Sequence, residues 1–283
     1  MNYEITNLPE NENVSVHEGV IKTTDANNQT VAFKYTFAEE SYATQEHSDM
    51  RFGLFNELVF SRLAKTLGIR AADNNLAKRG NKYGIVSPWF LGENEVIKPM
   101  KLRNRNKGED EELAFKYFQQ SDVGEILRQC RSLPLDPTFE KNFIETYLFS
   151  VLMSNWDHPS IDLKGKNYIF NNISITRDKI TEMHNMVTYH DFEGSTFSEN
   201  NDYSNDCSDE VRQGYKSNIA TLRQDHGEVL NNFLANLEKV NAEEICDVTS
   251  PHLDVISPKF ARDKYTKMVS KGLKEQISFM TER

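Results

Sequence analysis

The sequence predicts an α+β protein in which a small β-rich N-terminal part precedes a larger, mainly helical C-terminal part. Before residue 91, alternating β-branched and aromatic segments flank a single pattern of helical period. From Glu111 onward the helical period dominates, with one polar interruption. Strands that come first and helices that come later favour an α+β fold over one in which the two alternate.

The first strands are predicted at Ser15–Thr24 and Thr30–Phe37, which are rich in β-branched residues that alternate with polar ones. Asp25–Asn28 separates them and consists largely of turn-forming residues. The two segments are therefore expected to form a β-hairpin.

A helix is predicted over Arg51–Gly68, because apolar residues recur there at helical spacing and Gly68 suits a C-terminal cap. Asn74–Ala77 and Tyr83–Phe90 then predict a second hairpin.

The C-terminal part is expected to be built from helices. They are predicted at Leu113–Gln120, Ser121–Cys130, Pro137–Ser154, Glu210–Val240 and Phe260–Phe279. The polar stretch Ser154–Ser195 carries two brief strand patterns, at Tyr168–Phe170 and Met186–Tyr189.

Composition narrows the class of protein. The chain has 283 residues, of which 38% are hydrophobic, enough for a sizeable core. Its formal net charge is -10, so no direct nucleic-acid binding is expected. No membrane span is expected, because no apolar run is long enough to cross a bilayer. The first residues lack the pattern of a secretory signal, so the protein is expected to be cytoplasmic, or secreted without a classical signal peptide.

Two local features are read as structural. Cys130, Cys207 and Cys246 lie far apart in the chain and are expected to be reduced thiols. The basic segment Lys98–Lys107 precedes a run of acidic residues and is expected to be a solvated loop.

Three polar side chains mark the ends of predicted elements in the polar stretch. Asp157 follows a helix, Asn167 precedes the first strand pattern, and Asp191 follows the second. One aspartate can orient a hydroxyl and accept its proton, while an asparagine and a second aspartate supply oxygen ligands to magnesium. The trio therefore indicates phosphoryl transfer.

A lysine in the β-rich part fits the same chemistry. Lys34 lies on a predicted strand, where it can neutralise part of a triphosphate. Glu57 lies on or near the apolar face of the predicted helix and can hold Lys34 in place, as the paired acid does in kinases.

The polar stretch resembles the catalytic loop of HipA-type kinases. Asn155–His158, with Lys166 and Asn167 downstream, is similar to the family pattern N-x-D-x-H-x-K-N. Asp191 resembles the metal-binding aspartate of the family.

The resemblance extends to the N-terminal part. Asn56 and Glu57, followed by Arg62–Ile69, are similar to the family segment N-E-x(n)-R-L-A-x-x-x-G-I. With Lys34, the resemblance covers four ordered segments between Val31 and Gly194.

The resemblance implies a set of roles, with ATP and Mg2+ as cofactors. Asp157 would be the catalytic base, Asn167 and Asp191 the magnesium ligands, Lys34 with Glu57 the phosphate anchor, and Trp89, Phe90 and Leu91 the interlobe hinge beside adenine.

It also implies a protein-kinase-like two-lobed fold, with a kinase-like lobe at residues 1–91 and a helical lobe at residues 92–283. The implied activity is that of a serine/threonine protein kinase able to autophosphorylate and acting as a bacterial toxin or effector. The chain is short, like the compact branch of the family. Its expected partners are ATP, a protein substrate with a Ser or Thr hydroxyl, and an antitoxin or host protein.

The chain departs from the family pattern in two places. Asp157 and Asn167 are ten positions apart, which predicts an insertion at Pro159–Gly165, and His158 follows Asp157 directly. No glycine precedes Gly19, and Leu8–Asn13 holds two glutamates that would repel a triphosphate. Two alternatives therefore stay open: a pseudokinase or regulatory binding protein with a kinase fold, and a small-molecule or lipid kinase.

Overall fold

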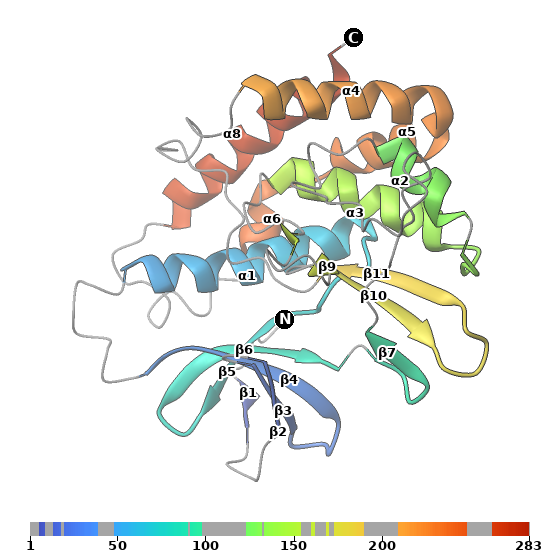
Figure 1. Cartoon of the computed structure of the whole chain (residues 1–283). Coiled ribbons are helices and arrows are strands. Elements are labelled where there is room, and N and C mark those ends of the chain that lie inside the picture. Colours follow the sequence, from blue (N-terminus) through green and yellow to red (C-terminus); the bar gives the residue numbers. More distant parts are fainter. Residues whose placement is uncertain are drawn as a thin grey trace.

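A sheet-rich part lies below a helical part in the orientation of Figure 1, as the sequence predicts. The structure is a computed structural model. It describes residues 6–8, 14–17, 20–38, 48–89, 91–97, 123–131, 133–153, 160–161, 168–169, 173–189, 209–247 and 262–282.

The N-terminal part is built on a six-stranded sheet with the strand order β1-β5-β6-β4-β3-β2. The strands are β1 (Thr6–Asn7), β2 (Val14–His17), β3 (Val20–Thr24), β4 (Thr30–Ala38), β5 (Asn75–Arg79) and β6 (Lys82–Pro88). Neighbouring strands are antiparallel, except that β1 and β5 are parallel.

Both predicted hairpins are confirmed. In the turn between β3 and β4, the Asp25 carboxylate accepts hydrogen bonds from the N–H groups of Asn27 and Gln29, at 2.9 and 2.8 Å. Asn28 in this turn has a positive φ of 58°, which asparagine tolerates better than most residues. In the turn between β5 and β6, Gly80 has a φ of 57°.

The segment Ser15–Thr24, however, is not the single strand that its pattern predicts. β2 ends at His17, β3 begins at Val20, and the two pair antiparallel. Because β-branched residues continue on both sides of Glu18 and Gly19, alternation alone does not reveal the reversal.

The predicted helix is α1 (Ser48–Leu67), and it lies between the sheet and the helical part. It contacts β4 and β6 as well as α5 (Gly227–Leu237) and α6 (Ala242–Cys246). Gly68 ends the helix as predicted, with a φ of 72°. The N–H of Gly68 donates to the Lys65 carbonyl (3.2 Å), and that of Ile69 donates to the Ala64 carbonyl (2.9 Å).

The helical part is centred on α3 (Phe139–Met153), most of whose side chains are buried. The helices around it are α2 (Val123–Cys130), α4 (Asp209–Asp225), α5, α6 and α8 (Arg262–Thr281). Asn218 links α4 to both α3 and α2: its Nδ2 donates to the Tyr147 hydroxyl (2.9 Å) and its Oδ1 accepts from the Val123 N–H (3.1 Å). The helix expected at Leu113–Gln120 lies outside the described residues.

The single helix predicted over Glu210–Val240 is wrong, because the chain breaks between α4 and α5. The break falls at His226, whose backbone leaves the helical region with a φ of -138° and a ψ of 35°, and Gly227 begins α5. His226 Nδ1 lies 3.1 Å from Glu140 Oε1 on α3, and α5 packs against α3 beyond the break.

Two small sheets complete the fold. β7 (Glu95–Ile97), β10 (Ile173–Asp178) and β11 (His184–Tyr189) form one in the order β11-β10-β7. β8 (Ser160–Ile161) pairs with β9 (Tyr168–Ile169) in the other. The two predicted strand patterns are thus β9 and β11, but they lie in different sheets, and β10 was not predicted.

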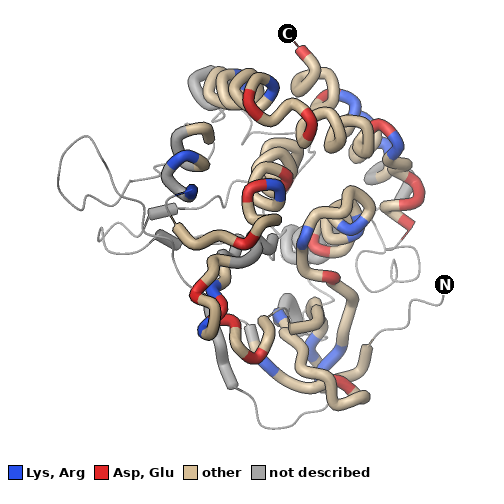
Figure 2. The backbone as a smooth tube through the Cα atoms, turned by 90° about the vertical axis from the view of Figure 1, so that its right-hand side faces the viewer, with Lys and Arg blue, Asp and Glu red and all other residues tan. Residues whose placement is uncertain are grey.

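The sheet of the N-terminal part has two distinct faces. Leu76 and Ile85 belong to the main hydrophobic core with α1 and the C-terminal helices, whereas Val31, Phe33 and Val86 belong to a smaller core. Acidic and basic residues are interspersed along both parts in Figure 2. Among the described helices, none combines the length and apolar character needed to cross a membrane.

Candidate functional site

The candidate site is centred on an ion pair between the sheet and α1. Lys34 Nζ on β4 lies 3.0 Å from Glu57 Oε1 on α1. The Lys34 side chain is 26% exposed and that of Glu57 only 4%. A buried carboxylate is stable only with partners, and the partly exposed lysine side chain can still meet an anion from solvent.

The alternation of side chains along β4 places Lys34 on the face of the sheet that is turned toward α1. Its neighbour Phe33 is fully buried in the smaller core on the opposite face. Lys34 is in register with Val20 on β3 and with Ile85 on β6, and Ile85 belongs to the core that contains α1. The side chain therefore points toward α1.

The second oxygen of Glu57 is held by a residue that sequence reasoning missed. Asn74 Nδ2 donates to Glu57 Oε2 at 2.9 Å, and Asn74 is 6% exposed. The sequence pattern predicts a strand that begins at Asn74, but β5 begins at Asn75. Only the path of the chain after α1 brings this amide to the carboxylate.

The predicted hinge begins on the same face of the sheet. Lys22 pairs in register with Ala32, two residues before Lys34, so the three side chains share a face. Lys22 Nζ lies 4.7 Å from the ring centroid of Trp89, and the Trp89 N–H donates to the Thr30 carbonyl (3.1 Å). The structure thus places Trp89 on the Lys34 side of the sheet, while Phe90 lies outside the described residues.

A few residues after Leu91, at Glu95, the chain enters β7 of the three-stranded sheet. Glu95 Oε2 accepts from the Gly92 N–H (2.8 Å), and Thr176 Oγ1 on β10 donates to Glu95 Oε1 (3.3 Å). Leu91 itself is half-buried. The segment between β6 and β7 is therefore a short covalent connection from the six-stranded sheet to the helical part.

Burial lowers the pKa of Arg70, which follows α1, while the charges of Glu95 and Asp136 act in the opposite direction. Arg70 thus lies in the electrostatic field of the first residue of β7 and of the segment that leads into α3.

Asp157, Asn167 and Asp191 lie outside the described residues, so their predicted roles stay predictions. The elements that lead to two of them are neighbours, because α3, which ends at Met153, packs against β11, which ends at Tyr189. Over the described parts of the chain, no group of three or more His, Cys, Asp or Glu residues is placed to hold a metal ion.

These features define a protein-kinase-like two-lobed fold. An antiparallel run β2-β3-β4 is followed by a helix and by two further strands, and the lysine of the third strand pairs with a glutamate of that helix. A mainly helical part follows.

Solved structures with the same architecture include the crystal structure of the Helicobacter pylori proinflammatory kinase CtkA. The likeness covers 97% of this chain and 94% of that chain, with a TM-score of 0.54 and 14% sequence identity. At this identity the likeness establishes the fold, and it confirms the two-lobed kinase-like architecture that the sequence predicts.

Two further solved structures are less similar to this chain. HipA of Shewanella oneidensis MR-1, in a toxin–antitoxin complex with HipB and operator DNA, has a TM-score of 0.45 at 12% identity, over 95% of this chain and 64% of that chain. The golgi casein kinase has a TM-score of 0.41 at 11% identity, over 98% and 72%. The fold assignment does not depend on these two. No protein-family model and no curated protein matches the sequence.

Proposed function

We propose that this chain is an ATP- and magnesium-dependent phosphotransferase, specifically a serine/threonine protein kinase of the HipA type. The observation that carries the proposal is the ion pair of Lys34 with Glu57 at 3.0 Å, between the third strand of the antiparallel run and the helix that follows it. Kinases use this pair to hold the lysine that binds the triphosphate.

The sequence supplies the rest of the proposed machinery. Asp157 would orient the acceptor hydroxyl and take its proton, and Asn167 and Asp191 would bind Mg2+. Amide and carboxylate oxygens are the donors that a hard cation prefers, so the donor set fits magnesium. When bound, the ion would neutralise charge on the transferred phosphoryl group.

Trp89 and Leu91, with Phe90 between them, are proposed to flank the adenine. This proposal is supported by the position of Trp89 on the sheet face that carries Lys34. A lobe boundary between residues 91 and 92 is proposed on the same basis, because β6 belongs to one sheet and β7 to another.

The biological setting is proposed from the motif resemblance. A toxin or effector role, autophosphorylation and an antitoxin or host partner all belong to this part of the proposal. Of the β3 hydroxyls that could receive phosphate, Thr23 is 6% exposed, so Thr24 on the same strand is the better acceptor.

A pseudokinase is the second candidate, favoured by one observation. Kinases cover the phosphates with a glycine-rich hairpin, whereas β2 and β3 are separated here by Glu18 and Gly19, with one glycine and one acid. Weakened nucleotide binding would follow.

The deciding experiment is transfer of labelled γ-phosphate from ATP with Mg2+, to the chain itself and to a generic protein acceptor. The comparison is between wild type, Asp157→Ala and Asp191→Ala, each checked for folding by circular dichroism. Label that is lost in both variants would support the proposal. Nucleotide binding without transfer would favour the pseudokinase, and transfer to small hydroxyl compounds or lipids alone would favour the other class of kinase.

A further inference from the structure

We propose that Asn74 is a positioning residue, which fixes the orientation of Glu57 and through it the phosphate-binding ammonium of Lys34. This inference rests on the proposed function of the Lys34 site. It adds a residue outside the motifs that pointed to that function.

The first argument is the arrangement around the carboxylate. Glu57 Oε1 accepts from Lys34 Nζ (3.0 Å), and Glu57 Oε2 accepts from Asn74 Nδ2 (2.9 Å). With a different donor on each oxygen, the carboxylate plane is fixed, so Lys34 meets a carboxylate of defined orientation. A single donor would leave rotation about the last side-chain bond of Glu57 less restrained.

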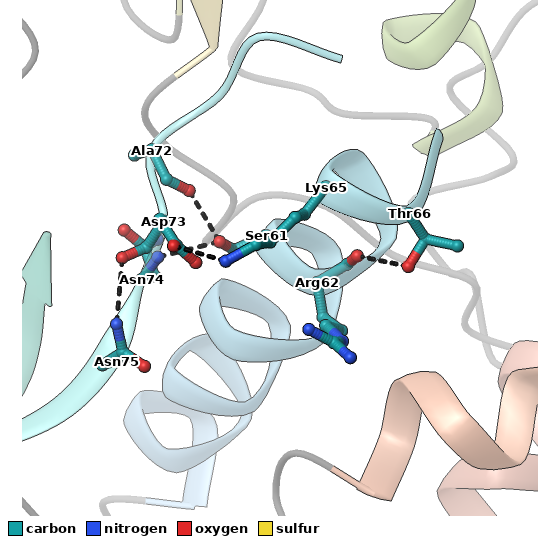
Figure 3. Close-up of polar contacts among 8 residues, drawn as sticks. All are labelled: Ser61, Arg62, Lys65, Thr66, Ala72, Asp73, Asn74 and Asn75. Carbon is teal, nitrogen blue, oxygen red and sulfur yellow. Dashed lines mark hydrogen bonds and ion pairs between the residues drawn. The ribbon is translucent and has the colours of Figure 1, made fainter. Parts of the chain in front are cut away.

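The second argument is that Asn74 is itself held on two sides. The Asn74 N–H donates to Ser61 Oγ (2.9 Å), and Ser61 Oγ donates to the Ala72 carbonyl (2.6 Å), as Figure 3 shows. Ser61 lies one helical turn after Glu57 on α1, so residues on two successive turns contact the segment 72–74.

The hydrogen bonds of Glu57 and Ser61 to the segment 72–74, which we call the clamp, fix how α1 is rotated relative to the sheet. Ser61, Glu57 and Asn74 are 2%, 3% and 6% exposed, so water cannot readily replace their hydrogen bonds. Close to the clamp, at the surface, Lys65 Nζ lies 2.6 Å from Asp73 Oδ2 and adds an exposed tie between α1 and the same segment. The Lys34–Glu57 pair depends on this rotation, because Glu57 must face β4.

The chemistry of an asparagine suits this position. Its amide donates a hydrogen bond without adding charge, so the Lys34–Glu57 pair keeps its balance of one cation and one anion. A carboxylate at position 74 would place a second negative charge against Glu57, which favours protonation of one of the two acids.

The test compares Asn74→Asp with Asn75→Asp. Both variants exchange an amide for a carboxyl of nearly the same shape, but Asn75 is exposed and its Nδ2 donates to the Asp73 carbonyl (3.2 Å). The readouts are the KM for Mg·ATP and the kcat of phosphate transfer, measured from about pH 8 down to about pH 6, where a carboxyl beside another acid becomes protonated.

We expect Asn74→Asp to raise the KM for Mg·ATP at least roughly tenfold at the upper pH, in keeping with the loss of a hydrogen bond to a charged group. The defect should shrink as the pH falls, because the protonated carboxyl again donates to Glu57. Asn75→Asp should stay near wild type at every pH. The inference would be overturned if the KM for Mg·ATP of Asn74→Asp, divided by that of wild type, did not change with pH. The same holds if this ratio equalled that of Asn75→Asp.

A second measurement separates this inference from the proposed function. Carbon-13 labelling of lysine gives a side-chain NMR signal for Lys34, assigned by its disappearance in Lys34→Arg. If wild type binds no nucleotide, the proposed function fails, yet the Lys34 signal should still shift in Asn74→Asp and not in Asn75→Asp. An unshifted signal in folded Asn74→Asp would contradict the positioning role on its own.

Discussion

Gly84 on β6 lies directly against the backbone of Lys34 on β4. A Cβ at Gly84 would collide with the Lys34 carbonyl oxygen and approach the Phe33 ring to 3.0 Å. The two strands shift register next to this point, where Tyr35 pairs with Gly84 and Phe37 with Tyr83. The backbone that carries Lys34 therefore has its position because residue 84 has no side chain.

Gly84→Ala should consequently lower the free energy of unfolding by about 2–3 kcal/mol, as overpacking of a well-packed core does. It should also weaken Mg·ATP binding, because β4 must move and Lys34 moves with it. Gly92→Ala is the matched control, since a Cβ there would lie 3.4 Å from the Glu95 carboxylate, an ordinary contact. Urea denaturation of both variants measures the loss of stability, and a nucleotide titration measures Mg·ATP binding. Equal stability of Gly84→Ala and Gly92→Ala would contradict the predicted collision at Gly84.

The ion pair itself predicts a pattern of coupling. Lys34→Met and Glu57→Gln should each reduce phosphate transfer by roughly a hundredfold, the scale of removing one preorganised electrostatic group. The double variant should lose little more than either single one, because both substitutions disable the same lysine.

The control for this pair is Lys22→Met, which removes a lysine from the same sheet face and its contact with the Trp89 ring. It should alter the KM for ATP more than the kcat, because Lys22 neighbours the proposed adenine site and not the phosphates. The shared role would be contradicted if the double variant of Lys34 and Glu57 lost phosphate transfer by the product of the two single-variant losses.

Some of this site could be predicted from the sequence because its determinants are local. Alternation around Phe33 and Lys34 fixes the face of each side chain, and helical spacing places Glu57 on the buried side of α1. Gly68 ends that helix at a positive φ that glycine adopts freely. Each of these inferences needs only a few neighbouring residues.

The rest depends on chain paths that no local pattern encodes. Asn74 lies in the polar run Asp73–Asn75, where nothing in the sequence distinguishes the buried amide from its exposed neighbours. The break at His226 accompanies the packing of α5 against α3, and the reversal between β2 and β3 is hidden by continued alternation. The grouping of Asp157, Asn167 and Asp191 remains a prediction, because all three lie outside the described residues.

The cap of α1 yields a separate prediction about stability. Gly68 has open space around it but a φ of 72°, so Gly68→Ala meets no collision and still forces a left-handed backbone. It should cost about 1 kcal/mol. Gly227→Ala, which also meets nothing within 4 Å, lies at the start of α5 and should be neutral or stabilising. Thermal unfolding distinguishes the two, and equal effects would contradict the assignment of Gly68 as a left-handed cap.

Glu140 near the start of α3 predicts a pH dependence of stability, because it contacts Arg131, which follows α2, and His226 at the break after α4. The hydrogen bond from Arg131 lowers the pKa of Glu140, burial opposes that effect, and the charges of Arg131 and His226 lower the pKa further. Arg131 Nη2 lies 3.0 Å from Glu140 Oε1. Because the folded pKa lies below the unfolded one, Glu140 stabilises the fold at neutral pH, and this contribution is lost as the pH falls through the folded pKa.

Glu140→Gln should therefore unfold at lower denaturant concentration than wild type near pH 7, with the difference shrinking toward about pH 3. The pKa of Glu145, further along α3, shifts in the opposite direction, because burial raises it more strongly than Lys141 lowers it. Glu145→Gln should be neutral or stabilising near pH 7, with any gain disappearing as the carboxyl of the wild type protonates on acidification. Parallel pH profiles for the two variants would show that the Arg131 contact does not stabilise the ionised form of Glu140.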